Sequence, residues 1–196
     1  MFELKVLGVF EASLLMKNGW PTRVVSLIDP NGEFKSHGEH HIVMQLHDIA
    51  SHINDSYITP TREHLDEILD FTKDLTHGDK LLVHCHMGVS RSTAIACGIL
   101  IQHGMTYQAA YEHVRSVRDC LLPNTLFVKY IDEKFGLNGN FIKFVTTNRT
   151  PEIQQQVNKM IDRDIKSSVF HMKDVLAKLR SLDEEEKRIL DIDKAS

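Results

Sequence analysis

Two kinds of hydrophobic pattern alternate along the first half of the chain. Short apolar runs rich in β-branched residues predict strands, and stretches with apolar residues every three or four positions predict helices. The predicted strands are Leu4–Val9, Arg23–Ile28, His41–Leu46 and Lys80–His84. We therefore expect an α/β fold with a central, mostly parallel sheet flanked by helices. Functional loops of such a fold lie beyond the carboxyl ends of its strands.

The helices predicted around these strands have recognisable ends. Thr59 can cap a helix whose first position is Pro60 and which runs to about Thr76. The stretch Ser92–Gln102 is apolar on nearly all sides, which is typical of a helix buried against a sheet. The other predicted helices are Glu11–Lys17, Tyr107–Arg118 and a last one that ends near Phe135 and Gly136.

The character of the sequence changes beyond about Gly139, and no strand signal follows Thr150. Apolar residues then recur at helical spacing from Ile153 to Leu179. We predict an α/β domain over residues 1–149 and an amphipathic helical C-terminal extension over residues 150–196. We favour packing of its apolar face on the same domain, and the alternatives are a homodimer seam or contact with a partner through the 150–180 helix.

Composition narrows the classes of function. A chain of 196 residues, 42% of them hydrophobic, can bury one full core. Its formal net charge of -4 argues against general binding of nucleic acid or of a membrane surface. The N-terminus lacks the charged region of a leader, and no run approaches the roughly 18 apolar residues of a membrane span, so we expect a cytoplasmic protein. The three cysteines form no CxxC pair, which favours a reactive thiol over a disulfide framework.

The segment from Leu81 to Ser92 combines a hydrophobic strand, a short loop and the start of a helix. Backbone N–H groups in a tight loop that leads into a helix form a concave site for a dianion, and the helix dipole adds positive charge. Gly88 allows a backbone conformation that a side chain would forbid. Arg91 carries a planar guanidinium that can hold two phosphoryl oxygens. The predicted phosphate-binding residues are His86, Met87, Gly88, Val89, Ser90 and Arg91.

Cys85 lies at the start of this loop, where the same N–H groups, the helix end and Arg91 favour its thiolate form. It is therefore the candidate nucleophile. Ser92 can donate a hydrogen bond to the sulfur and help it leave in a second step, and His84 orders the loop rather than acting as a base. A buried structural thiol beside a surface arginine is the alternative. The order strand, Cys, Gly, Arg, hydroxyl and apolar helix argues against it.

The residues from His84 to Ser92 read His-Cys-His-Met-Gly-Val-Ser-Arg-Ser. This segment matches the signature His-Cys, five residues, Arg-Ser/Thr, and the chain thereby resembles the cysteine-dependent protein tyrosine phosphatase superfamily, in its dual-specificity form. The resemblance is closest to a bacterial branch of predicted cytoplasmic tyrosine phosphatases and covers roughly Leu4 to Ile142. It implies a phosphatase-type α/β fold. The extension from Thr150 onward has no counterpart in it.

Flanking residues carry the resemblance to the bacterial branch. In that branch an Asp-Ile follows the third strand, and a Pro-Asn leads to an Asp-Glu helix and a pair of glycines. The matching residues are Asp48, Ile49, Pro123, Asn124, Asp132, Glu133, Gly136 and Gly139. The Pro-Asn of the family suggests that the Asn124 amide braces the phosphate loop, and a helix N-cap explains this residue equally well.

The chemistry that the resemblance implies needs a protonated group over the leaving oxygen, which can afterwards activate water. Asp48 follows the strand His41–Leu46 at the edge where the phosphate loop also emerges, and it matches the family position. Asp55 is nearer to Cys85 in the sequence and lies in a polar loop. We favour Asp48 as the general acid. Either residue could instead serve only in a turn or a cap.

Four histidines, His37, His40, His41 and His47, invite a metal hypothesis. Their spacing fits no familiar set of ligands, and they are divided between a loop and a strand whose alternate residues face opposite ways. We expect solvated or hydrogen-bonded histidines, no metal site and no cofactor.

The resemblance implies hydrolysis of phosphotyrosine, with phosphoserine and phosphothreonine as further candidate substrates, through a phosphocysteine intermediate. The expected partner is a phosphorylated protein. No lysine lies between Cys85 and Arg91. A highly charged inositol phosphate is therefore a less favoured substrate. The alternatives are an inactive phosphatase that only binds phosphorylated partners, and an RNA 5′-phosphatase with the same loop chemistry. The intact Cys85, Arg91 and Ser92 weigh against the first, and the acidic balance of the chain weighs against the second.

Overall fold

The computed structural model describes residues 1–30, 32, 38–51, 54–160 and 162. The chain forms two compact units, Met1–Gln154 and Gln155–Ser196. The first unit contains every strand and helix discussed below. Most of the predicted C-terminal extension lies outside the described residues, and so does most of the 150–180 surface predicted to bind a partner or a second copy. Within the described part of the chain, no helix has the length and apolar character needed to cross a membrane.

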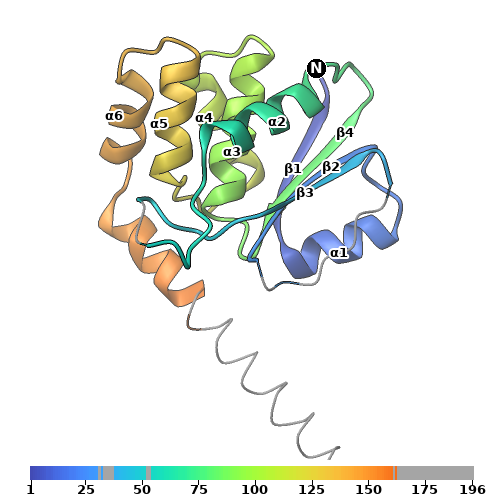
Figure 1. Cartoon of the computed structure of the whole chain (residues 1–196), viewed down its shortest axis with the longest axis horizontal. Coiled ribbons are helices and arrows are strands. Elements are labelled where there is room, and N and C mark those ends of the chain that lie inside the picture. Colours follow the sequence, from blue (N-terminus) through green and yellow to red (C-terminus); the bar gives the residue numbers. More distant parts are fainter. Residues whose placement is uncertain (31, 33–37, 52–53, 161, 163–196) are drawn as a thin grey trace, which may run out of the picture. The chain divides into compact units, whose positions relative to one another are not determined.

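A parallel sheet forms the centre of the first unit (Figure 1). Its strands, in chain order, are β1 (Glu3–Gly8), β2 (Arg23–Ile28), β3 (His41–Gln45) and β4 (Lys80–Cys85). Their order across the sheet is β1-β4-β2-β3, and every neighbouring pair is parallel. The predicted parallel sheet is confirmed. Because the strands are parallel, all four carboxyl ends lie at one edge.

Helices cover both faces of the sheet (Figure 1). They are α1 (Val9–Lys17), α2 (Arg62–Thr72), α3 (Arg91–Gln102), α4 (Tyr107–Val117), α5 (Thr125–Lys134) and α6 (Asn140–Thr147). Helix α1 packs on one face through Ala12, against Val24 and Leu82 of the central strands. The other five lie on the opposite face, where the main core forms. Side chains along β4 alternate between the two faces of the sheet. Leu81 and Val83 belong to the main core, whereas Leu82 packs with Ala12 of α1.

Helix α2 begins two residues later than the sequence suggested. Thr61, not Thr59, is the N-cap, and its Oγ1 accepts a hydrogen bond from the His64 N–H. The Thr59–Pro60 prediction was wrong because both threonines carry the same local capping signal, and only the extended backbone of Thr61 brings its hydroxyl to the first turn. The helix also ends at Thr72 rather than near Thr76. Leu75 lies beyond the end of the helix but is also buried. The apolar positions in the sequence therefore keep helical spacing past the point where the helix ends.

Helix α6 was not predicted. Its N-cap is Gly139, which has a left-handed backbone (φ 80) and no capping side chain. The cap comes from α5: the buried Asp132 carboxylate accepts hydrogen bonds from the N–H groups of Gly139 at 2.6 Å, Phe141 at 2.7 Å and Ile142 at 3.1 Å. A negative group at a helix N-terminus also complements the helix dipole. Asp132 and Gly139 thus join two helices.

Replacing Asp132 by alanine removes the acceptor for three N–H groups at the start of α6. We expect the free energy of unfolding to fall by about 2–4 kcal/mol, because buried donors without partners are unfavourable. Urea denaturation measures this change. The adjacent Glu133→Ala is the matched control, since the Glu133 side chain makes exposed ion pairs with Arg62 and Lys129 and its loss should change stability by under about 1 kcal/mol. Equal losses in the two variants would contradict this account of α6.

Candidate active site

Loops from all four strands meet at the carboxyl edge of the sheet. The loop of residues 85–91, here called the phosphate loop, joins β4 to α3. Asp29 directly follows β2, and Asp48 lies three residues after β3. Gly8 ends β1 at the start of α1. Residues far apart in the sequence therefore surround the predicted nucleophile because the sheet is parallel.

The main-chain carbonyl groups of the phosphate loop are bound by groups that surround it. Five consecutive carbonyl oxygens, from His86 to Ser90, accept hydrogen bonds from other parts of the chain. The donors, in that order, are the Val9 N–H at 3.0 Å, Arg118 Nη2 at 2.7 Å, Arg118 Nε at 3.1 Å, the Leu122 N–H at 2.9 Å and the Asn124 N–H at 3.2 Å.

These contacts orient the opposite side of each peptide group. In a planar trans peptide the C=O and N–H bonds point in opposite directions, so carbonyl groups held outward turn the following N–H groups toward the centre of the loop. The Gly88 N–H accordingly donates to the Cys85 Sγ at 3.2 Å. This inward N–H agrees with the concave set of donors expected from the sequence, and binding of a dianion by the loop stays a prediction.

Cys85 lies at the base of this loop and is 2% exposed. Its Sγ is 3.2 Å from the Oγ of Ser92, the predicted hydrogen-bond partner. Helix α3 begins at Arg91, and the side chain of its N-cap Ser90 makes no capping hydrogen bond; the Ser90 hydroxyl donates to Asp48. The first N–H groups of α3 are therefore not used by a capping side chain, and the positive end of the helix dipole lies at the loop.

Gly88 is required at its position for two reasons. Its backbone has φ +70, in the left-handed region that favours glycine. A Cβ there would also lie 2.4 Å from the carbonyl carbon of Leu7. The phosphate loop therefore packs directly on the end of β1.

Arg91 is 2% exposed and is held along one edge of its guanidinium. Nη1 donates to Asp29 Oδ1 at 2.9 Å and to the Leu46 carbonyl at 2.6 Å. Among the described residues, the buried Nε has no hydrogen-bond partner, although Asp48 Oδ2 lies 3.7 Å away. The Nε and Nη2 edge is the one suited to two phosphoryl oxygens. Asp29 is a site residue that was not predicted, although its place directly after a central strand is a signal in the sequence.

Asp48 lies beside the phosphate loop. Its Oδ1 accepts hydrogen bonds from Ser90 Oγ at 2.7 Å and from Asn124 Nδ2 at 2.9 Å. Asn124 also caps α5, because its Oδ1 accepts from the N–H groups of Leu126 and Phe127. Asn124 is therefore a helix N-cap, and its side-chain amide donates to Asp48 and to the Ile49 carbonyl rather than to the phosphate loop, whose Ser90 carbonyl accepts from the Asn124 main-chain N–H. Asp55 is exposed in a turn between β3 and α2.

His84 is buried beneath the loop in a hydrogen-bonded cluster. The Ser26 hydroxyl lies 2.5 Å from Nε2 of His84 and 2.7 Å from Nε2 of His41. One hydroxyl proton can serve only one of the two rings, so the hydroxyl must accept from the other. Burial, together with the nearby His41, lowers the pKa of His84 to about 4. His84 is therefore neutral at physiological pH, which fits an ordering role better than a charged one.

The contacts and burial of His47, Cys97 and Cys120 fit structural roles. His47 Nδ1 accepts a hydrogen bond from the Ile58 N–H, whereas His37 lies outside the described residues. Within the described ranges, no group of three His, Cys, Asp or Glu side chains is arranged to hold a metal ion. Burial raises the pKa of the thiols of Cys97 and Cys120, as expected of unreactive cysteines.

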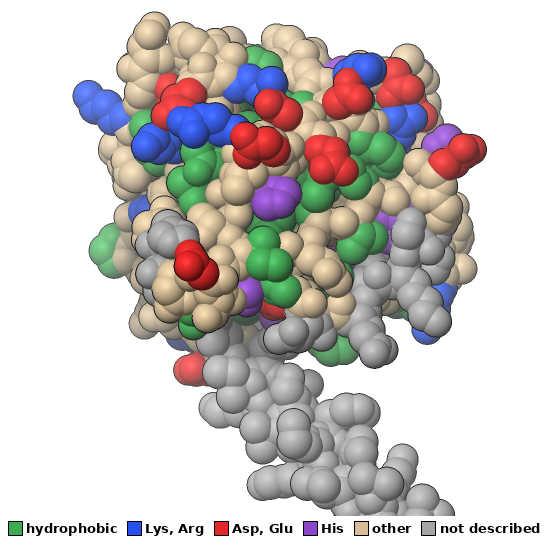
Figure 2. All heavy atoms as spheres, viewed as in Figure 1, with side chains coloured by type: hydrophobic (Ala, Val, Ile, Leu, Met, Phe, Trp, Pro, Cys, Tyr) green, Lys and Arg blue, Asp and Glu red, His purple; other side chains and the backbone are tan. Residues whose placement is uncertain are grey.

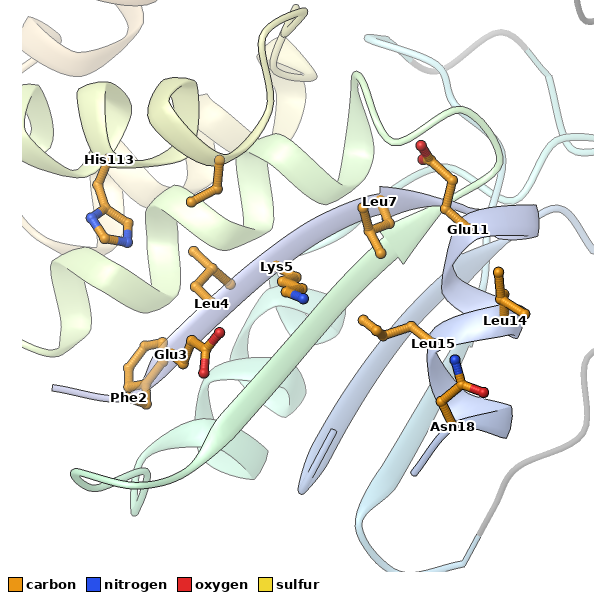
Figure 3. Close-up of a pocket in the computed structure, with 11 residues that line it drawn as sticks. Phe2, Glu3, Leu4, Lys5, Leu7, Glu11, Leu14, Leu15, Asn18 and His113 are labelled. Carbon is orange, nitrogen blue, oxygen red and sulfur yellow. The ribbon is translucent and has the colours of Figure 1, made fainter. Parts of the chain in front are cut away.

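A hollow of about 780 Å³ lies beside the edge strand β1, between α1 and α4 (Figure 3). Apolar side chains such as Leu4 and Leu15 line it, together with Glu3, Lys5 and His113. None of the predicted site residues lines this hollow. Glu11 lines the hollow and accepts a hydrogen bond from Arg118, which also binds the phosphate loop.

The family described as "Dual specificity phosphatase, catalytic domain" matches residues 24–135, which include Cys85, Arg91 and Asp48. The chain belongs to this family. It is 38% identical over 72 residues to Dual specificity protein phosphatase 1 of Arabidopsis thaliana, which is 36% of each chain. It is 36% identical over 73 residues to a probable rhodanese domain-containing dual specificity protein phosphatase of Dictyostelium discoideum, which is 36% of this chain and 15% of that protein. The aligned part thus spans well under half of these relatives.

Solved structures share the fold at low sequence identity. DUSP15 has a TM-score of 0.53 at 18% identity, covering 76% of this chain and 94% of the other. The Yvh1 phosphatase domain from Chaetomium thermophilum has a TM-score of 0.51 at 23% identity, covering 72% and 95%. The predicted phosphatase-type α/β fold is confirmed, as is membership of the dual-specificity group. The closer resemblance to a bacterial branch stays a prediction.

The low pKa of His84 predicts a specific pH dependence of stability. The folded protein keeps His84 neutral down to about pH 4, whereas the unfolded chain binds its proton below an ordinary pKa of 6.5. This contribution to stability is therefore fully present above pH 6.5 and is lost as the pH falls toward 4. Between pH 7.5 and 5, we expect wild type to lose about 2 kcal/mol more than His84→Gln in urea denaturation. Parallel losses would show that His84 is not neutral in the folded state.

Proposed function

We propose that this chain is a cysteine-dependent phosphatase that hydrolyses phosphotyrosine in proteins, with phosphoserine and phosphothreonine as further substrates. One observation carries the proposal: the phosphate loop runs from Cys85, whose sulfur accepts a hydrogen bond from the Gly88 N–H, to Arg91, whose buried Nε has no hydrogen-bond partner among the described residues. That arrangement suits three equatorial phosphoryl oxygens above a nucleophile. Membership of the dual-specificity family supports the same reaction.

In the first step, the Cys85 thiolate attacks phosphorus in line with the leaving oxygen. The S–P bond forms as the P–O bond to the substrate breaks, and the negative charge stays on the three equatorial oxygens. The loop N–H groups and Arg91 stabilise that charge in a site with little solvent. Asp29 and the Leu46 carbonyl support this step because they hold Nη1 and leave the other guanidinium edge to the phosphoryl group.

Asp48 is the proposed donor of the proton that the leaving oxygen takes up. Its Oδ2 lies 3.7 Å from Arg91 Nε, close to where the phosphoryl group would bind. This position lets the carboxyl group reach the leaving oxygen.

In the second step, water replaces sulfur on phosphorus. Asp48, now ionised, accepts a proton from the water as the O–P bond forms and the S–P bond breaks. Ser92, at 3.2 Å from Sγ, stabilises the departing thiolate. The products are inorganic phosphate and the free thiolate, so the two steps need neither a metal nor a redox cofactor.

Charge on the surface agrees with a protein partner. Ion pairs such as Arg62–Glu133 and Lys134–Asp66 occur among the described residues. On the face seen in Figure 2, basic and acidic side chains are interspersed. This part of the described surface offers no continuous basic field for a nucleic acid. We propose a phosphorylated protein as the substrate and the cytoplasm as the location.

Turnover of para-nitrophenyl phosphate tests the proposed function. We expect wild type to hydrolyse it equally with and without EDTA, and Cys85→Ser to lose at least about 1,000-fold in kcat because the hydroxyl is a poor nucleophile here. Intact-mass measurement after rapid acid quenching should detect the phosphorylated enzyme in wild type only. Loss of turnover with EDTA would point to a metal enzyme. Absence of turnover with retained phosphate binding would favour a binding module.

The choice between the two aspartates has its own test. With substrates whose leaving groups are poor, Asp48→Asn should lower kcat by about 100-fold and flatten the pH profile on its alkaline side, where loss of the acid's proton limits the rate. Asp55→Asn is the control and should leave the profile unchanged. The reverse result would move the role to Asp55.

A further inference from the structure

Arg118 lies at the end of α4 and uses all three guanidinium nitrogens. Nη2 donates to the Met87 carbonyl at 2.7 Å and Nε to the Gly88 carbonyl at 3.1 Å. Nη1 donates to Glu11 Oε2 at 3.0 Å. The side chain is 15% exposed. One cation therefore holds two consecutive carbonyl groups of the phosphate loop from outside.

Glu11 fixes this arrangement to the rest of the fold. Its Oε2 accepts hydrogen bonds both from Arg118 and from the Gly8 N–H at 3.1 Å. Figure 3 shows Glu11 on the first turn of α1, directly after β1. The contact thus joins the end of β1, the phosphate loop and the end of α4, three segments that are distant in the sequence.

The two carbonyl groups that Arg118 holds are the ones that most need an external support. They belong to the peptide groups on either side of Gly88, whose backbone lacks the restriction that a side chain imposes. The opposite ends of these peptide groups are the N–H groups of Gly88 and Val89. Because a hydrogen bond from a cation polarises a peptide group, it also strengthens the N–H as a donor to an anion.

We propose that Arg118 is a positioning residue that holds the Gly88 and Val89 N–H groups toward the phosphoryl group, with Glu11 fixing its third nitrogen. It touches neither the substrate nor the nucleophile. Its effect on catalysis rests on the proposed function, whereas its effect on phosphate binding does not.

Arg23 provides a matched control for a merely structural arginine. Its side chain is 16% exposed, and it too donates to a main-chain carbonyl, that of Phe71, and pairs with a carboxylate, that of Asp74. Arg23 is the first residue of β2, at the opposite edge of the sheet from the phosphate loop. Its replacement should therefore affect stability without affecting the site.

The experiment compares Arg118→Met and Arg118→Lys with Arg23→Met and Arg23→Lys. Methionine keeps much of the apolar stem and removes every donor, while lysine keeps the charge without the planar fork. For each folded variant, we would measure the urea midpoint, kcat and KM for para-nitrophenyl phosphate, and the dissociation constant of inorganic phosphate. The last comes from protection of Cys85 against iodoacetamide, read by mass spectrometry.

We expect Arg118→Met to weaken phosphate binding and to lower kcat by about tenfold or more, since two charge-assisted hydrogen bonds behind the loop are lost. Arg118→Lys should lie between this variant and wild type. The Arg23 variants should lose stability but keep phosphate affinity and kcat.

Two results would overturn the proposal. One is Arg118→Met with a lowered urea midpoint but phosphate affinity and kcat within twofold of wild type, which would make Arg118 merely structural. The other is a wild type in which phosphate gives no protection of Cys85. If wild type shows no turnover but is protected, and Arg118→Met weakens that protection, the proposed function fails while the positioning role of Arg118 stands.

Discussion

The outward hydrogen bonding of the carbonyl groups from His86 to Ser90 is the constraint on which the site depends. A loop of N–H groups that all face one point is electrostatically unfavourable by itself, because like partial charges lie close together. It persists when the opposite ends of the same peptide groups are bound firmly elsewhere. The donors come from the start of α1, from the end of α4 and from the segment before α5, so segments that are distant in the sequence support the loop together.

The charged groups of the site follow from the same topology. Arg91 would be an unfavourable buried cation without partners. Asp29 after β2, and the Leu46 carbonyl and Asp48 after β3, supply them, because parallel strands bring these segments to one edge. Only one edge of the guanidinium is used for support. The arrangement balances the charge of Arg91 and still leaves a fork for an oxyanion.

Most elements of the first unit could be predicted because their signals are local. The strands were found within one residue at each end, since short β-branched runs differ clearly in period from helices. Helix α6 was missed because its cap, Asp132, lies on the preceding helix. Arg118 and Glu11 were missed for a related reason: they are 107 residues apart in the sequence, and nothing near either residue indicates the other.

The sequence by itself determined the α/β class, the position of the phosphate loop and the kind of chemistry that a thiol and an arginine six residues apart can perform. These features are encoded in contiguous residues, where the spacing fixes the geometry. Tertiary structure decided which carboxylates face Arg91, how Asn124 serves two purposes and which groups hold the loop from outside. Those pairings depend on which strand ends share an edge, and strand order is a property of the whole chain rather than of any segment.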